Sequence, residues 1–164
     1  VLIREGDPSA AVDAVNAYVL SHSAVNRFIS LWVGVLDSTT GQLAFVDAGH
    51  GHWAFCRAQG TPESEQVAGH PPVGIDGETR FDAAVVQCEP GDRIVIMTDG
   101  VVEQPGGEEQ EQFGMERVLE VLSKTETPSA DVAGLHTAVC AFASTDLLDD
   151  DTTIASFQFV GREP

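Results

Sequence analysis

The chain has 164 residues, 43% of them hydrophobic, which is the size of one globular domain with its own core. Its 26 acidic residues against eight basic ones give a formal charge of −18. Because phosphate groups are bound by clustered Lys and Arg, this balance excludes nucleic acid and anionic membrane surfaces as expected partners. No apolar run approaches the roughly 18 residues of a membrane span, so no membrane segment is predicted.

The first predicted element is a helix at residues 8–21. Asp7 is a suitable N-cap, and Pro8 is a suitable first helical residue because its missing N–H would have no helical partner there. Apolar residues then recur at the three-to-four spacing of one buried helix face. They are Val12, Val15, Tyr18 and Val19.

The middle of the chain changes to the pattern of strands, in which aromatic and β-branched residues are bounded by Gly, Pro and Asp. The segment 68–74 is too rich in Gly and Pro for a helix or a central strand, which predicts a structured loop. The predicted strands are residues 27–36, 42–48, 53–57, 80–86, 94–97 and 152–160.

Helices are grouped towards the end of the chain. Residues 113–123 show helical spacing, and Thr127-Pro128 begins a further helix that extends to about Ser144. The acidic, glycine-rich segment 105–111 before them is predicted to be mobile. Strands joined by short turns and followed by helices predict an α+β fold with mainly antiparallel sheets, in a single domain of residues 1–164.

The three cysteines, Cys56, Cys88 and Cys140, are odd in number, and no two of them form a CxxC pair. Two of them lie in apolar stretches, so we expect buried thiols of a reduced compartment and a cytoplasmic location. The sequence shows no GxSxG motif and no Cys–His pair. Hydrolysis by a side-chain nucleophile therefore has no support.

The strongest chemical signal is the stretch Thr98-Asp99-Gly100, which follows the apolar strand 94–97. A carboxylate at the mouth of a buried strand is costly to desolvate unless a cation or hydrogen-bond donors compensate it. The glycine allows a sharp turn or the close approach of a ligand. The two interpretations are a plain turn and a ligand site.

A second acidic cluster, Asp149-Asp150-Asp151, lies directly before the last predicted strand. Together with Asp99 it predicts two strand ends that present carboxylates to one place. Carboxylate oxygens are the ligands that Mg²⁺ and Mn²⁺ prefer. The alternative is that the acidic residues form a solubilising surface, and both statements can hold together.

Six short motifs, taken in order, resemble one family. This ordered series is similar to the bacterial sporulation-stage-two-E-like serine phosphatases, a branch of the type-2C metal-dependent protein phosphatases, and the resemblance extends from about Val12 to Phe159. The motifs are Asp47-Ala48-Gly49-His50, Pro72-Val73-Gly74, Pro90-Gly91-Asp92, Thr98-Asp99-Gly100-Val101 with Glu103, Phe113-Gly114-Met115-Glu116-Arg117 and Asp150-Asp151-Thr152-Thr153.

The resemblance implies an αββα sandwich of two antiparallel sheets flanked by helices, with a two-metal Mn²⁺ or Mg²⁺ centre. It also implies hydrolysis of phosphoserine or phosphothreonine on a regulatory protein of the anti-anti-sigma type in bacterial signalling. By motif, Asp99 and Asp150 are the implied metal ligands and catalytic residues, and Asp149 is an alternative to Asp150 shifted by one residue. Gly100 matches the glycine that lets the chain pass close to the metals.

One part of the family pattern is missing. An Asp-x-Ser-Gly-His-Gly motif with the aspartate that bridges both metals is expected before the helix at Pro8, and the sequence there reads VLIREGD. We expect that the chain begins late within an N-terminally truncated catalytic domain that is fused to an upstream sensor domain, because the downstream motifs are intact. Unpaired edge strands would then allow a homodimer.

Two other interpretations stay open. One is a catalytically inactive pseudophosphatase that acts as a binding or regulatory module. The other is an acidic cation-binding domain without catalysis, in which metal binding survives the loss of either Asp99 or Asp150.

Overall fold

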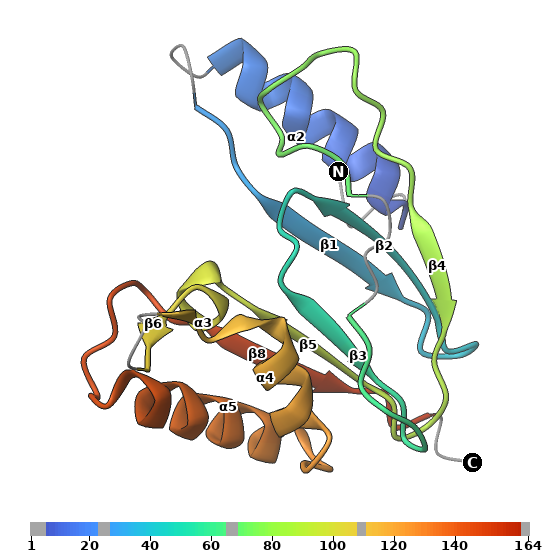
Figure 1. Cartoon of the computed structure of the whole chain (residues 1–164). Helices are drawn as coiled ribbons and strands as arrows, with labels where there is room; N and C mark the ends of the chain where they lie inside the picture. The colour runs from blue at the N-terminus through green and yellow to red at the C-terminus, as the bar shows by residue number, and fades with distance from the viewer. Residues whose placement is uncertain (1–5, 23–26, 65–68, 108–110, 162–164) are drawn as a thin grey trace. The chain divides into compact units, whose positions relative to one another are not determined.

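Residues 6–22, 27–64, 69–107 and 111–161 are described by the computed structural model, shown in Figure 1. They belong to two units. The first unit comprises Val1–Gly51 and Gln66–Cys88, and the second comprises His52–Glu65 and Glu89–Glu163. Each unit has a three-stranded antiparallel sheet with helical cover, which confirms the predicted α+β class.

The sheet of the first unit has the strand order β1-β2-β4, and both pairs are antiparallel. Its strands are β1 (Leu31–Leu36), β2 (Gln42–Ala48) and β4 (Ala84–Gln87). Helix α2 (Pro8–His22) packs against β1 and β2, as Figure 1 shows. The buried residues that form the core of this unit are Val12, Val19, Val46, Ala48, Val73 and Phe81.

The predicted cap of helix α2 is confirmed, but one predicted core residue is wrong. The carboxylate of Asp7 accepts a hydrogen bond from the N–H of Ser9 at 2.9 Å. Tyr18, expected on the buried face, is 63% exposed and stacks on His22 with ring centroids 4.2 Å apart. Asn16 is buried instead, and the backbone N–H of Gly74 donates to its Oδ1 at 2.7 Å.

The Asp-Ala-Gly-His and Pro-Val-Gly motifs have structural roles in this unit. The N–H of His50 donates to Asp47 Oδ1 at 2.8 Å, which closes the turn after β2. Gly49 has φ +74°, and a Cβ there would lie 2.5 Å from Pro72 Cδ. The first motif therefore needs glycine where the proline-rich loop packs against it.

The sheet of the second unit has the order β3-β5-β8, again antiparallel, so the predicted buried central strand is confirmed. The strands are β3 (Trp53–Cys56), β5 (Arg93–Met97) and β8 (Ile154–Gln158). Helix α5 (Pro128–Ala143) packs against β8 and β5, and α4 (Gly114–Leu122) packs against α5. Buried residues from β3, β5, α3 (Asp99–Val102), α4 and α5 form one core in this unit.

Local signals explain where the last helices begin and end. The side chain of Thr127 accepts a hydrogen bond from the N–H of Ala130 at 3.3 Å, which caps α5 as predicted. Ser144 ends the helix in the left-handed conformation, with φ 57°. The segment 105–111 was predicted to be mobile, but its two ends are ordered as strands, because β6 (Pro105–Gly106) pairs with β7 (Glu111–Gln112). Residues 108–110 lie outside the described residues.

Several strands are shorter than predicted. β1 begins at Leu31 rather than at residue 27, β4 begins at Ala84 rather than at residue 80, and β8 ends at Gln158. Cys56 and Cys88 are buried as expected, whereas Cys140 is only partly buried. Among the described residues, no helix has the length and apolar character that crossing a membrane requires.

Candidate functional site

Antiparallel pairing of β5 and β8 determines where the acidic clusters lie. Met97 at the end of β5 pairs with Ile154 at the start of β8. The chain that leaves β5 and the chain that enters β8 are therefore neighbours at one end of the sheet. This brings the segment beginning at Asp99 beside the segment 149–151, as the strand patterns predicted.

Thr98 joins the two segments through both its backbone and its side chain. Its N–H donates to Thr153 O at 3.0 Å, its hydroxyl donates to Asp151 O at 3.0 Å, and the N–H of Thr153 donates to the same hydroxyl at 2.9 Å. Three bonds between two short segments hold them in one register. The geometry of the acidic residues on either side is set by this contact.

Gly100 lies directly beneath the second acidic segment. A Cβ atom at this position would be 2.6 Å from the carbonyl oxygen of Asp151 and 3.2 Å from its carbonyl carbon. Because real Cβ atoms do not approach backbone so closely, only glycine allows α3 (Asp99–Val102) to begin here. The residue was predicted to let the chain pass close to metals, and in the structure the close approach is to the backbone of Asp151.

Gln104, which was not identified from the sequence, contacts the backbone of both Asp149 and Pro105 at the site. It is 3% exposed, its Oε1 accepts from the N–H of Asp149 at 3.0 Å, and its Nε2 donates to Pro105 O at 3.1 Å. A single glutamine between Glu103 and Pro105 has no pattern that predicts burial. Its role depends on the contact with Asp149, 45 residues later.

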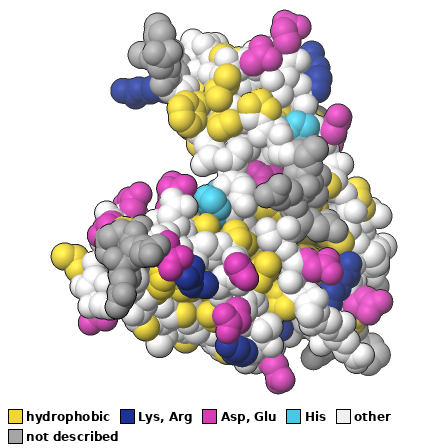
Figure 2. Space-filling model, in the orientation of Figure 1, with side chains coloured by type: hydrophobic (Ala, Val, Ile, Leu, Met, Phe, Trp, Pro, Cys, Tyr) yellow, Lys and Arg dark blue, Asp and Glu magenta, His cyan; other side chains and the backbone are white. Residues whose placement is uncertain are grey.

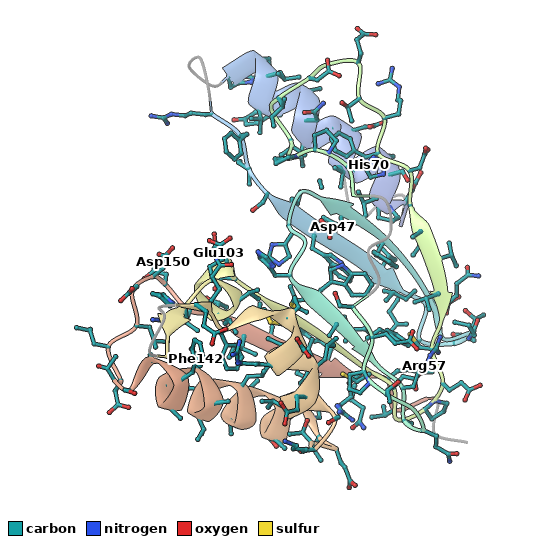
Figure 3. The ribbon with its side chains drawn as sticks, in the orientation of Figure 1. Asp47, Arg57, His70, Glu103, Phe142 and Asp150 are labelled. Atoms are coloured by element: carbon teal, nitrogen blue, oxygen red, sulfur yellow. The ribbon has the colours of Figure 1, made fainter. Side chains whose placement is uncertain are left out.

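The predicted site residues line one hollow of about 270 Å³ in the second unit. Asp99, Gly100, Asp149 and Asp150 all contribute to it, together with Glu103, Gln104 and Pro105. Figure 3 shows Glu103 and Asp150 beside each other at this end of the unit. Since both Asp149 and Asp150 line the hollow, the structure does not choose between them as the residue that matches the family's aspartate.

The carboxylates are exposed rather than buried, which corrects the expectation of a costly desolvated aspartate. Asp99, Asp149 and Asp150 are exposed, whereas Gly100 beneath them is buried. Asp99 Oδ1 accepts from the N–H of Gly100 at 2.9 Å, and Asp150 Oδ1 accepts from the N–H of Asp151 at 2.7 Å. The carboxylates of Asp99 and Asp150 are thus each oriented by the next backbone amide while they remain accessible from solvent.

This donor set fits a hard divalent cation in kind. Mg²⁺ is commonly held by one or two carboxylates and keeps several waters, and exposed aspartates allow that arrangement. In the part of the chain that the structure describes, no three His, Cys, Asp or Glu side chains are grouped closely enough to hold an ion. The roles of Asp99, Asp150 and Asp149 as ligands remain a prediction.

The comparisons with known proteins decide the family. Residues 2–159 match the family model described as Stage II sporulation protein E (SpoIIE). The chain belongs to the SpoIIE family. This confirms the resemblance drawn from the six ordered motifs, and the SpoIIE match includes the segments of both units.

Two solved structures show that this SpoIIE-family chain has the fold of PP2C phosphatase domains. The SiaA-PP2C domain of Pseudomonas aeruginosa has a TM-score of 0.78 and 23% identity, over 96% of this chain and 63% of that one. The Mn-presoaked phosphatase domain of the cell fate determinant SpoIIE from Bacillus subtilis has a TM-score of 0.68 and 23% identity, over 99% of this chain and 70% of that one.

A curated relative is much longer than this SpoIIE-family chain. Protein IcfG of Synechocystis sp. is 29% identical over 114 residues, which are 69% of this chain and 18% of IcfG. The chain therefore spans less than a fifth of the length of that relative.

Proposed function

We propose that this chain is part of the catalytic domain of a metal-dependent protein serine/threonine phosphatase, which hydrolyses phosphoserine or phosphothreonine on a regulatory protein. The observation that carries the proposal is the convergence of Asp99 and Asp150 on one hollow beside the paired ends of β5 and β8. The SpoIIE match over residues 2–159 supports the assignment of both units to one phosphatase domain.

Asp99 and Asp150 would hold Mn²⁺ or Mg²⁺, with Asp149 as the alternative to Asp150 and Glu103 on the same hollow. Two similar structures support these metals. One is the SpoIIE phosphatase domain that was presoaked with Mn, and the other is RsbX in complex with magnesium. Bound divalent cations would supply an activated water and would neutralise charge on the phosphate and on the leaving oxygen.

The residues of the chain itself supply orientation. Thr98 joins the two acidic segments, Gly100 allows them to approach, and Gln104 holds the N–H of Asp149. Ligands that are held before a substrate arrives do not have to be ordered at the moment of reaction.

The charge of the chain supports dependence on cations. Acidic side chains are spread over the face of each unit visible in Figure 2, and the formal charge is −18. A phosphorylated side chain is itself an anion, so its approach to a hollow lined by Asp99, Glu103 and Asp150 is repulsive until cations compensate the carboxylates.

We propose a phosphorylated anti-anti-sigma-type protein as the substrate, and a sensor domain that controls the phosphatase from an upstream position. The description of the Bacillus subtilis SpoIIE protein as a cell fate determinant supports a signalling role. The small share of IcfG that the chain covers supports attachment to further domains.

Calorimetric titration with Mn²⁺ tests the site. We expect saturable binding by the wild-type chain and loss of that binding in both Asp99→Asn and Asp150→Asn. The matched control is Asp151→Asn, because Asp151 contacts Thr98 through its backbone carbonyl rather than through its side chain. Binding that persists in both single variants would instead support the acidic cation-binding domain without catalysis.

Hydrolysis of a phosphoserine protein, assayed with Mn²⁺ and the same variants, then separates an enzyme from a binding module. Phosphate release that depends on Asp99 supports the phosphatase. Binding of Mn²⁺ and of the phosphoprotein without release would support the pseudophosphatase. That alternative is motivated by one observation: among the described residues, no group of three His, Cys, Asp or Glu side chains is arranged so that it could hold a metal ion.

A further inference from the structure

Strand β8 is an outer strand of the sheet in the second unit. The sheet has the order β3-β5-β8, so β8 pairs with β5 along one side only. Natural edge strands are commonly protected from further pairing by a charged side chain, a proline or a covering segment. The nine residues 152–160, which include β8, contain no charged residue and no proline. The strand therefore has neither of the first two protections.

The backbone of every second residue in β8 points away from β5. The carbonyl oxygen of Thr153 accepts from the N–H of Thr98 at 3.0 Å, and the N–H of Phe159 donates to Asp92 O at 2.9 Å. Because backbone groups alternate in direction along a strand, the residues between these two that face outward are Ile154, Ser156 and Gln158. Among the described residues, no group forms a hydrogen bond with their outward N–H and C=O groups.

The other outer strand of the same sheet is covered. Beside β3, the backbones of Phe55 and Glu63 exchange two hydrogen bonds, of 2.8 and 2.9 Å. All four residues of β3 are buried, whereas β8 is only partly buried and Phe157 is 58% exposed. Within the described residues, this sheet therefore has one covered edge and one edge that is open to a further strand.

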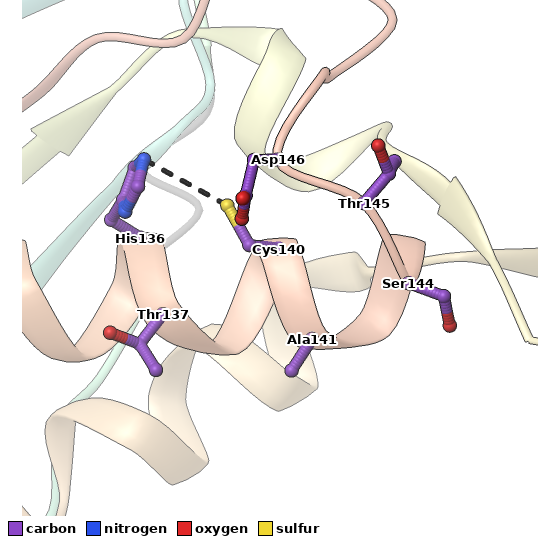
Figure 4. A pocket seen from close by; sticks show the side chains of 7 residues that line it. All are labelled: His136, Thr137, Cys140, Ala141, Ser144, Thr145 and Asp146. Atoms are coloured by element: carbon purple, nitrogen blue, oxygen red, sulfur yellow. Dashed lines mark hydrogen bonds between the residues drawn. The ribbon is translucent and has the colours of Figure 1, made fainter.

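A groove of about 830 Å³ lies beside β8 and gives such a strand room. Its walls are the first half of β8 and one face of α5, where Val132 is 37% exposed. His136 bounds the groove towards the C-terminal half of the helix, and its Nε2 lies 3.8 Å from Cys140 Sγ, as Figure 4 shows. This contact corrects the expectation that the chain has no Cys–His pair. The groove thus combines unpaired backbone with apolar side chains, which are the two features that an added strand uses.

We propose that a second copy of this chain occupies the open edge, through antiparallel pairing of β8 with the partner's β8 about a two-fold axis at Ser156. Ser156 then lies opposite the partner's Ser156, and Ile154 lies opposite the partner's Gln158. Each of these outward-facing pairs exchanges two backbone hydrogen bonds. The same register places the small Ala155 opposite the partner's Phe157, which covers an aromatic ring that is exposed in the single chain.

The charge of the strand favours a second copy as the partner. An acidic or basic peptide would meet no opposite charge on residues 152–160, whereas a second β8 is equally uncharged. Pairing about a two-fold axis is also self-complementary, so one surface serves both copies. The formal charge of −18 on each chain opposes the encounter at longer distances, and salt screens this repulsion, so the dimer becomes tighter as ionic strength rises. The expected homodimer thereby has a defined surface, which does not depend on the proposed phosphatase activity.

Sedimentation velocity over a range of protein and salt concentrations tests the pairing. We expect a monomer–dimer equilibrium in the wild-type chain, with a dissociation constant that falls as salt is added. Gln158→Pro removes an N–H that points away from β5, and Phe157→Lys places a charge on the edge, so each should weaken dimerisation at least about tenfold. The matched control is Val85→Lys on β4, an outer strand of the first unit, where Val85 is 60% exposed and dimerisation should be unchanged. Circular dichroism verifies that each variant is folded.

Cysteine cross-linking tests the register. An Ala155→Cys chain mixed with a Phe157→Cys chain, both also carrying Cys140→Ser, should form a disulfide-linked dimer under mild oxidation. Neither chain should do so alone, because identical positions lie diagonally across the pair. Cys56 and Cys88 are 1% and 2% exposed, so in the folded chain they do not compete. A wild-type chain that stays monomeric at high concentration and high salt, a dimer that persists in both β8 variants, or cross-linking of either cysteine variant by itself would overturn the inference.

Discussion

The central strand β5 has an aspartate beyond each of its ends, and the two have opposite surroundings. Asp92, before the strand, is 2% exposed and accepts bonds from Arg57 Nη1 at 3.0 Å and from the N–H groups of Ala58 and Glu89. Asp99, after the strand, is exposed and lies on a hollow that it shares with other acids. The Asp92 carboxylate is satisfied by several donors of the protein, whereas the Asp99 carboxylate accepts from the N–H of Gly100 and is exposed to solvent.

The end near Asp92 is also closed by a buried ion pair. Arg93 Nε lies 2.8 Å from Asp131 Oδ2, and Asp131 is completely buried. Thr125 and Ser156 donate their hydroxyls to the same carboxylate. Buried acids that meet Arg and hydroxyl donors hold the fold together, whereas exposed acids that meet other acids favour an external cation. Local charge balance therefore distinguishes the buried, paired aspartates at one end of β5 from the exposed aspartates near its other end.

Removing the buried ion pair of Arg93 and Asp131 should give the largest loss of stability. Asp131→Ala leaves the Arg93 guanidinium buried without its anion, so we expect the free energy of unfolding to fall by about 3–5 kcal/mol. Urea denaturation measures this change. The matched control is Lys124→Ala at the surface pair of Lys124 and Glu120, where both side chains are about two-thirds exposed and no measurable change is expected. Equal effects would show that the buried pair is not what holds this end.

Neutralising the two aspartates that flank β5, Asp92 and Asp99, compares the two ends of the strand directly. Asp92→Asn weakens the contact with Arg57, and we expect a loss of about 1–3 kcal/mol of stability without metal. Asp99→Asn should leave that stability unchanged or slightly raised, because it removes one of several neighbouring negative charges. Thermal unfolding with and without Mn²⁺ should then show a metal-induced increase in Tm for Asp92→Asn and none for Asp99→Asn. The opposite pattern would contradict the assignment of the two ends.

Gly100→Ala tests whether the close approach between Gly100 and the backbone of Asp151 positions the acidic site. The new Cβ would meet the carbonyl oxygen of Asp151 at 2.6 Å, so the acidic segment must move. We expect Gly100→Ala to cost about 1–3 kcal/mol and to weaken Mn²⁺ binding. The control is Gly77→Ala, where the Cβ would meet only Leu20 Cδ1, at an ordinary 3.6 Å. Unchanged Mn²⁺ affinity in Gly100→Ala would show that this approach does not position the site.

Sequence patterns predicted the elements better than their surroundings. The apolar run at 94–97 predicted a central strand, and the capping residues Asp7 and Thr127 marked helix starts, because these signals are local. Tyr18 was placed in the core because helical spacing alone does not show that Asn16 is needed under the loop at Gly74. At this position the contact with Gly74, rather than the helical spacing of apolar residues, determines which side chain is buried.

In the candidate site, too, the sequence predicted the residues that follow local patterns and missed those that depend on tertiary contacts. Asp99 and the 149–151 cluster could be brought together from two strand ends, since adjacent antiparallel strands place them side by side. Gln104 could not be found, because its burial and its bond to Asp149 exist only after the fold has formed. The contact between Cys140 and His136 corresponds to a spacing of four on a helix, but Cys140 was expected to be a buried thiol, so the pair was not identified.

The buried Cys56 thiol should make the stability of the second unit depend on pH. Burial raises the pKa of the Cys56 thiol from 9.0 to about 11, with Asp131 adding to the increase and Arg93 opposing it. Between these values the unfolded chain has lost the proton and the folded chain retains it. Stability from this group is therefore complete below pH 9 and declines as pH rises towards 11, by roughly 1 kcal/mol per pH unit. Urea denaturation between pH 8 and 11 should show a shallower decline for Cys56→Ala, and equal slopes would contradict the buried thiol as the cause.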